Sequence, residues 1–465
     1  MNTLKKFLLI IVIFLFSSSL FSAGFHVNVE QGMKAMGMGG AFVGLADDPT
    51  AIYFNPAGIT QLKGRFNFAA TYAFGKYDPE LHGGKIVDKY GITRIGPDNK
   101  EIDQRWAQIP SGYFTFKVNK NIYLGFAVFA PFGTATDWTH TWFGRYFADK
   151  TDLKTFDFNP TLAIKFNDKF SIGIGVNYVY GDVEIKKSFS YPFLAFNQQV
   201  QTLLGFKLSD AQQLSLYNRL YNRNYDVDIR LKGDTSDSSE GWGFNIGILF
   251  KPNDQWQFGA IYRSEVDLKF EGHATYKYMP GVATLGQEVG IPQLSMPLFK
   301  RSKIKAKITL PDYAAFGIVN KSFKNWTFLF DVYWTGWSDY DALTVKYKSF
   351  PYRSTVPKDW DDVWAFRFGA QYQATPSIAL RFGYWYDNTP VDDDTRGPEL
   401  PDMTKHTITF GVGVKKGRFN FDLAYLCGLY QEKHSKLVDE QTGTKLDGRW
   451  TLRSHVIGLT VSYSY

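Results

Sequence analysis

The sequence has little cysteine, no clustered histidine and no long apolar run after its N-terminus. A single cysteine, Cys427, in 465 residues excludes an intramolecular disulfide and a cysteine-based metal cage. Beyond residue 22 the longest uncharged run, 188–206, contains Asn197 and Gln199, so it is too polar to cross a bilayer as a helix. The histidines lie at scattered positions: 26, 82, 140, 273, 406, 434 and 455. None lies in a nucleophile signature, so we predict no enzyme, no metal site and no cofactor.

The net charge of the chain excludes one further class of partner. A formal charge of +7 is modest for this length, and the basic residues are scattered along the chain. A nucleic-acid-binding protein needs basic residues gathered on one face. The acidic run 392–394 could attract a divalent ion, but a solvated loop is the simpler interpretation.

The first 22 residues predict export. Lys5 and Lys6 form a basic start, the apolar run 7–16 follows, and small serines lead to a cleavage site between Ser22 and Ala23. We therefore expect residues 1–22 to be a signal peptide.

Aromatic residues are abundant, at 17% of the chain, although the mean hydropathy is only −0.24. In the run 170–180 large apolar residues alternate with small or polar ones, and the runs 364–373 and 378–387 repeat this pattern. The apolar faces extend over about ten residues, the length of a tilted transmembrane strand. This combination is typical of an outer-membrane β-barrel, in which one face of each strand contacts lipid.

Turns give the number of strands. Short polar turns alternate with connections of roughly 15 to 45 residues, and fourteen strands follow from this alternation. The short turns lie at 119–121, 167–169, 252–254, 321–325, 374–377 and 416–418. We predict an all-β membrane protein with a fourteen-stranded antiparallel barrel over residues 65–465, in the outer membrane of a Gram-negative bacterium.

The two ends of the mature chain carry further signals. The last strand alternates from Ile457 to the terminal Tyr465, which is similar to the signal read by the barrel-assembly machinery. Residues 23–64 lack strand alternation but are rich in glycine and apolar residues. We expect this segment, called the hatch below, to plug the lumen, because wide barrels are commonly closed by protein.

Several motifs resemble the FadL family of outer-membrane transporters for long-chain fatty acids and hydrocarbons. They are the run 39–44 followed by Asp47-Asp48 and Asn55-Pro56-Ala57, then the runs 130–136, 142–146, 241–245, 262–264, 310–312 and 386–402. The resemblance covers the mature chain in order.

The resemblance implies a monomer that takes up hydrophobic molecules by diffusion and releases them sideways into the membrane. It implies a hatch motif of Asn55, Pro56 and Ala57. A lateral gate at a kink in the third strand would involve Phe25, Pro131, Phe132 and Gly133. Proline lacks a donor for the strand ladder and glycine has no side chain to seal the wall, so this stretch can lose its pairing. The alternative is that the two residues simply mark the end of the strand.

The substrate stays open in the sequence. Fatty-acid members of the family are expected to hold the carboxylate with basic residues, and Lys187 and Lys346 are the candidates here. A plain hydrocarbon needs no such residue. A general diffusion porin and an adhesin-like structural barrel are the alternative functions, and outer-membrane lipid, including lipopolysaccharide, is an expected partner.

Overall fold

A computed structural model gives the structure of residues 25–87, 93–95, 107–190, 205, 207–211, 228–234, 239–288, 300–348, 353–439 and 443–465. The expected signal peptide lies outside these residues. Among the described residues, no helix has both the length and the hydropathy needed to cross a membrane.

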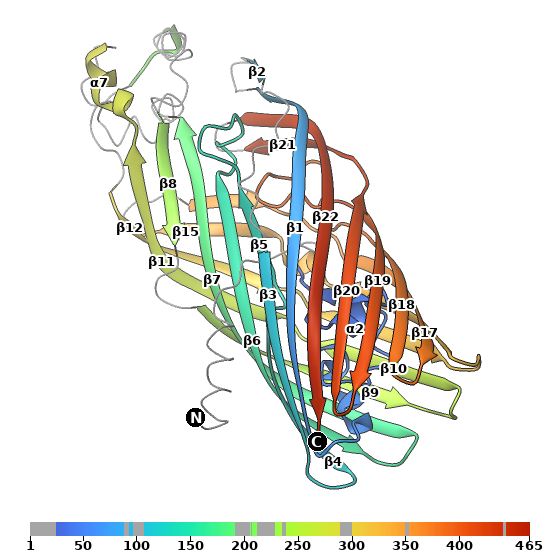
Figure 1. Cartoon of the computed structure of the whole chain (residues 1–465). Coiled ribbons are helices and arrows are strands. Elements are labelled where there is room, and N and C mark those ends of the chain that lie inside the picture. The colour runs from blue at the N-terminus through green and yellow to red at the C-terminus, as the bar shows by residue number, and fades with distance from the viewer. Residues whose placement is uncertain are drawn as a thin grey trace, which may run out of the picture.

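The described strands close into an antiparallel barrel (Figure 1). Fourteen of them pair in a ring, and the first pairs with the last over most of its length. In ring order they are β1 (Phe66–Val87), β3 (Ala107–Lys117), β4 (Ile122–Phe129), β6 (Lys150–Lys165), β7 (Phe170–Ser190), β9 (Ser239–Phe250), β10 (Trp256–Arg263), β13 (Tyr313–Asn320), β14 (Trp326–Thr335), β17 (Val363–Thr375), β18 (Ile378–Asp387), β19 (Lys405–Lys416), β20 (Phe419–Tyr430) and β22 (Thr444–Ser464). The predicted fold is therefore confirmed, and each predicted short turn joins two neighbouring strands.

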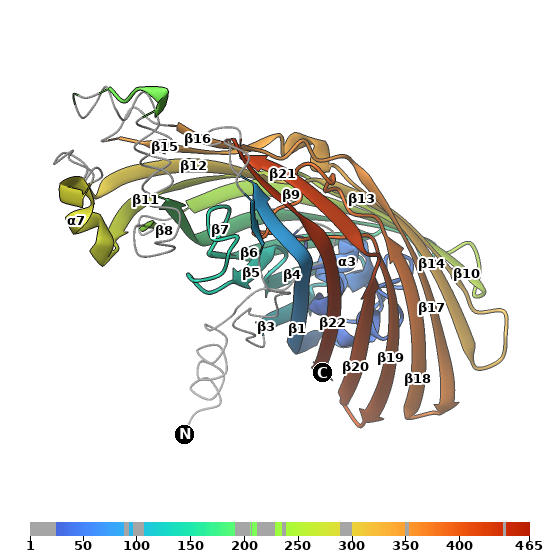
Figure 2. The same cartoon turned by 90° about the horizontal axis from the view of Figure 1, so that it is seen from above.

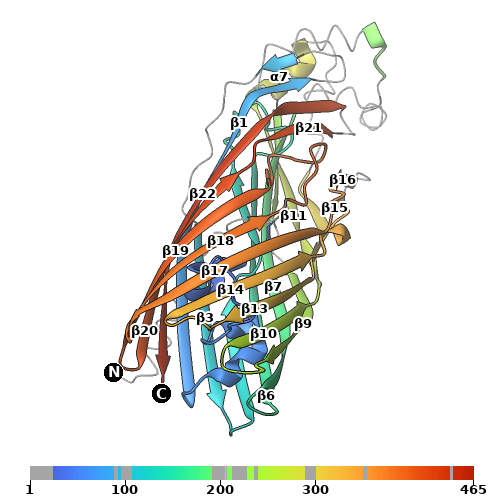
Figure 3. The same cartoon turned by 90° about the vertical axis from the view of Figure 1, so that its right-hand side faces the viewer.

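The other described strands extend the wall at the end opposite the short turns. They are β2 (Thr93–Ile95), β5 (Gly133–Asp137), β8 (Asp228–Asp234), β11 (Val266–Tyr278), β12 (Ser302–Leu310), β15 (Ala342–Tyr347), β16 (Arg353–Pro357) and β21 (Lys433–Asp439). Stretches expected to be loops thus contain strands, because their alternation continues with polar residues outside the lipid zone. On β7, for example, the outward series passes from Tyr178 and Tyr180 to Asp182 and Glu184. Figure 3 shows the tilt of β14, β17 and β18 and the extension beyond them.

The outer face of the ring is apolar and aromatic. Phe244 and Phe368 are each about half exposed and Trp242 is 66% exposed, and outward apolar residues on most strands of the ring are exposed as well. Such a band is stable only against lipid.

The hatch lies inside the ring (Figure 2). It consists of short helices joined by tight turns: η1 (Val29–Gln31), α2 (Met33–Met36), α3 (Ala51–Phe54) and η2 (Pro56–Gln61). Its apolar side chains, among them Met33, Phe42 and Ile52, are fully buried. Two further short helices, α7 (Pro280–Glu288) and η5 (Trp337–Asp339), belong to the opposite end and the lumen wall.

Inward glycines of the wall let the hatch come close to the strands. A β-carbon at Gly383 would lie 1.9 Å from the backbone nitrogen of Gly39, and one at Gly173 would lie 2.3 Å from the carbonyl carbon of Pro56. We call these wall residues the glycine belt: Gly125, Gly173, Gly247, Gly259, Gly317, Gly369, Gly383, Gly411 and Gly458. Each comes from a different strand, so contact with the hatch explains why small residues alternate with aromatic ones in the sequence.

Candidate functional site

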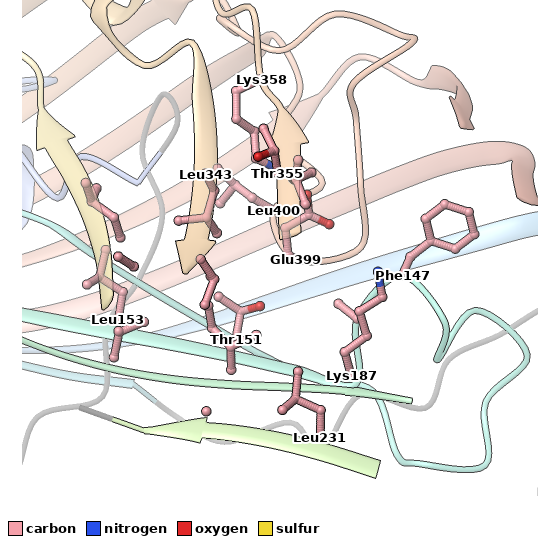
Figure 4. A pocket seen from close by; sticks show the side chains of 18 of the residues that line it. Phe147, Thr151, Leu153, Lys187, Leu231, Leu343, Thr355, Lys358, Glu399 and Leu400 are labelled. Atoms are coloured by element: carbon pink, nitrogen blue, oxygen red, sulfur yellow. Dashed lines mark hydrogen bonds and ion pairs between the residues drawn. The ribbon is translucent and has the colours of Figure 1, made fainter. Parts of the chain in front are cut away.

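A large apolar cavity lies in the lumen above the hatch, on the side away from the short turns. Figure 4 shows some of the side chains that line it. It encloses about 1630 Å³ of space between atoms, counted out to its open mouth. Its apolar lining includes Leu153, Val183, Ile185, Leu231, Phe270, Ile304, Ile308, Leu343, Val345 and Leu400. Apart from Leu400, which lies between β18 and β19, these side chains come from β6, β7, β8, β11, β12 and β15. The strand extensions that the sequence did not predict therefore form most of the cavity wall.

Phe25 of the hatch forms the floor of this cavity. Its ring packs against Trp337 at 4.8 Å, Tyr340 at 5.7 Å and Trp360 at 5.9 Å between centroids. It also contacts Phe132 at 6.0 Å. Phe25 is 4% exposed, and its buried ring lies between the cavity and Phe132 at the break in the third strand.

Four charged side chains line the cavity, and they form two pairs among the described residues. Lys187 contacts Asp439 at 3.1 Å, and Lys358 pairs with Glu399. Burial, with the nearby Glu399 carboxylate adding to it, raises the pKa of Tyr340, so its hydroxyl stays neutral. The cavity is therefore neutral overall.

The two lysines expected at the pocket occupy different places. Lys187 lines the cavity, whereas Lys346 is exposed. Lys346 alternates along β15 with Val345 and Tyr347, which line the cavity, so it lies on the outer face of the wall. Sequence reasoning missed Lys358, Glu399 and Asp439: they lie far apart in the chain, and the motif 386–402, which contains Glu399, gave no sign of its pairing with Lys358.

The third strand of the ring is interrupted between β4 and β5. Its ladder with β3 covers Gly112–Lys117, and no register partner from the third strand is described for residues 107–111. On the other side, β6 pairs with β4 up to Phe129 and resumes at Gly133. Residues 130–132 thus leave the wall, and Pro131 and Gly133 lie at this break.

The start of the hatch pairs with the segment that leaves the wall. The Val27 amide donates to the Pro131 carbonyl at 2.7 Å, and the Gly133 amide donates to the Phe25 carbonyl at 2.8 Å. The imidazole of His26 stacks on Phe132 at 4.7 Å. These contacts form a short antiparallel bridge.

Two polar side chains replace the missing ladder bonds. The Thr155 hydroxyl of β6 donates to the Phe132 carbonyl at 2.7 Å and accepts from the Phe132 amide at 3.1 Å. The Gln31 amide donates to the Ala130 carbonyl at 2.7 Å, and its oxygen accepts from the Ser111 hydroxyl at 2.7 Å. Gln31 therefore spans the break from β3 to the displaced segment. An isolated glutamine in an irregular segment gave no signal in the sequence.

The hatch motif joins the hatch to the wall. The Asn55 amide donates to the Val43 carbonyl within the hatch and to the Ile248 carbonyl of β9, both at 2.9 Å. Its oxygen accepts from the Ala57 amide at 3.2 Å, and Pro56 opens η2. All three residues of the motif are buried.

A buried ion pair and a buried carboxyl group of the wall support the hatch from below the cavity. Arg263 pairs with Asp157 at 2.9 Å, and its guanidinium lies over the ring of Tyr53 at 5.2 Å. Asp331 accepts from the Val43 amide at 2.8 Å. A buried charge is tolerated only with such partners, so the hatch and the wall depend on each other.

Comparison with known proteins agrees with this architecture. Residues 13–465 match the model of the family described as outer membrane protein transport protein (OMPP1/FadL/TodX). The chain belongs to this family. It is therefore an outer-membrane protein of a family of transport proteins, not of enzymes.

Individual relatives are distant but match along nearly their whole length. The long-chain fatty acid transport protein of Escherichia coli O6:H1 is 25% identical over 411 residues, 88% of this chain and 86% of the relative. Outer membrane protein P1 of Haemophilus influenzae is 23% identical over 452 residues, with 93% and 94% covered.

Solved structures show the same fold. A Pseudomonas aeruginosa FadL homologue superposes with a TM-score of 0.79 at 24% identity, covering 95% of this chain and all of the homologue. The toluene transporter TodX of Pseudomonas putida gives a TM-score of 0.66 at 16% identity, with 96% and 99% covered.

Proposed function

We propose that the protein carries hydrophobic molecules, fatty acids or hydrocarbons, across the outer membrane by diffusion through the apolar cavity. The observation that supports this most directly is the cavity itself, which is walled by aliphatic side chains and closed below by the hatch. Relatives named as transporters of long-chain fatty acids and of toluene agree with this class of substrate. A general diffusion porin would need an open aqueous lumen, and the buried hatch argues against it. No contact among the described residues favours an adhesin.

We further propose that the substrate leaves sideways through the break in the third strand. Phe25 contacts both the cavity and Phe132, so its displacement would connect the two. Each methylene moved from an apolar site into water costs about 0.8 kcal/mol, so a twelve-carbon chain would lose about 10 kcal/mol on entering the periplasm. Passage into lipid avoids this cost, and a wall without a complete ladder is where it can occur.

Closing the break tests the route. The variant replaces Ala130→Val, Pro131→Thr, Phe132→Val and Gly133→Thr, which restores an alternating strand able to pair with β3. We expect cellular uptake of dodecane to fall at least tenfold at equal surface level, while purified protein still binds dodecane. Gly133→Trp should act in the same direction but more weakly.

Pro311→Val is the matched control, because Pro311 lies at another strand interruption, between β12 and β13. It should leave uptake unchanged. Normal uptake by the folded, closed variant would overturn lateral exit and favour a route through the hatch. Absence of dodecane binding by the wild-type protein would overturn the channel proposal itself.

Two surface partners fit the outer faces of the barrel. The exposed lysines Lys303, Lys305 and Lys307 alternate along β12 beyond the lipid-facing band, where phosphate groups of lipopolysaccharide would lie. The aromatic end of β22 at Tyr465 is the segment that we propose is read by the barrel-assembly machinery.

A further inference from the structure

The charged groups of the cavity are arranged so that each cation already has an anion. Lys358 is almost fully buried, with 4% of its side chain exposed, and its ammonium group forms an ion pair with the Glu399 carboxylate. Lys187 and Asp439 are 18% and 13% exposed and lie 3.1 Å apart. Figure 4 shows Lys358 beside Glu399, with Lys187 in a separate part of the wall.

The position of Glu399 is fixed by its surroundings. The Trp138 indole donates to the Pro398 carbonyl at 2.7 Å, and the Arg396 guanidinium donates to the Asp402 carbonyl at 2.9 Å, so both sides of Glu399 are anchored. Tyr340, beside it, belongs to the cavity floor. The backbone that carries Glu399 is therefore held beside Lys358.

A ligand carboxylate entering this cavity meets an unfavourable balance. To reach either ammonium it must displace Asp439 or Glu399 from it, which breaks an ion pair in an apolar wall. If it displaces neither, it adds a negative charge to a neutral apolar chamber. An uncharged molecule changes neither pair and gains the full benefit of apolar contact.

We infer that the cavity selects uncharged hydrophobic molecules over fatty-acid anions, and that Glu399 and Asp439 determine this specificity by occupying the two lysines. This rests on the proposed function, because it assumes that the cavity is the binding site. Neutralising either acid frees a lysine in an apolar wall, which is the arrangement that a fatty-acid anion requires.

The test compares two ligands that differ only in the head group. Dodecan-1-ol and dodecanoate compete at pH 8 against an uncharged fluorescent naphthalene probe bound to the full-length mature protein in lipid nanodiscs. We expect the wild-type protein to bind dodecan-1-ol at least tenfold more tightly than dodecanoate. Glu399→Gln and Asp439→Asn should each increase dodecanoate affinity about tenfold and leave dodecan-1-ol affinity within twofold.

Matched controls separate the charge effect from a general one. On the outer face of the wall, Glu271 pairs with Lys305 and Asp267 pairs with Lys307. Glu271→Gln and Asp267→Asn each remove a carboxylate from such a pair and should change the affinity for neither ligand. The double variant Lys358→Gln with Glu399→Gln should keep dodecan-1-ol affinity and show no gain for dodecanoate. It also serves as the test where Glu399→Gln alone does not fold.

The outcomes are distinct. Equal or tighter binding of dodecanoate by the wild-type protein, or no gain in either single variant, overturns the specificity assignment while leaving the cavity as a binding site. Failure of the wild-type protein to bind the probe and both ligands overturns the proposed function together with it.

Discussion

Asn55 is the residue on which the docking of the hatch depends most directly. Asn55→Ala removes the donor from the buried Val43 carbonyl and from the partly buried Ile248 carbonyl, and a buried group left unsatisfied costs about 1–3 kcal/mol. We expect the barrel to assemble but uptake to fall severalfold, measured at equal surface level. Asn121→Ala loses one comparable bond, to the Lys165 carbonyl in a short turn, and should transport normally. Unchanged uptake by Asn55→Ala would show that the hatch motif has no role in transport.

Gln31 determines how firmly the break is held closed. Gln31→Leu removes the bonds to Ala130 and Ser111, so the pairing between Phe25–Val27 and residues 131–133 should open more often. Hydrogen–deuterium exchange should then be at least tenfold faster at the amides of Val27 and Gly133. Gln257→Leu, which loses a bond to the hatch at Gly44 far from the break, should leave these two amides unchanged. Slow exchange in Gln31→Leu would show that backbone pairing alone closes the gap.

At the scale of elements, the glycine belt determines how the short helices sit against the strands. Gly383→Ala places a methyl group in contact with the backbone of Gly39, which cannot retreat, and overpacking of this kind costs about 1–3 kcal/mol. We expect a lower thermal unfolding temperature and faster proteolysis of the hatch. Gly112→Ala is the control, because a methyl group there meets nothing within 4 Å. Equal stability of the two variants would contradict the close docking of the hatch.

The elements also show which parts of the structure the sequence could predict. Period-two alternation and polar turns gave the fourteen-stranded ring, because both are local consequences of one face in lipid and one in the lumen. The strand extensions were missed, since charged residues such as Asp267 and Lys305 face water there and the apolar alternation ends. The cavity was missed with them. Lys187 was placed at the pocket only by resemblance, and its partner Asp439 could not be found, because 252 positions separate them.

At the scale of the whole molecule, the hatch determines whether the lumen of the barrel is closed to water or open as an aqueous pore. The lumen around it is lined by glycine and by polar residues such as Arg263 and Asp331. Without the hatch, water would fill this space. Deletion of residues 25–62 should therefore give a barrel that conducts ions in planar bilayers, whereas the intact protein stays silent. Conduction by the intact protein would favour a porin, and a silent deletion variant that inserts normally would mean that other segments close the lumen.

The interruption of the third strand has a consequence for aggregation. Closing a sheet into a barrel removes every free strand edge, and the break restores two short edges, at residues 107–111 and 130–133. Pro110 has no amide hydrogen to offer, so the first edge presents one donor fewer to a foreign strand. The second is covered by the start of the hatch, where residues 25–27 form an isolated antiparallel bridge to it from within the lumen. The start of the hatch, which covers this break in the wall, thus also protects the barrel from pairing with its neighbours.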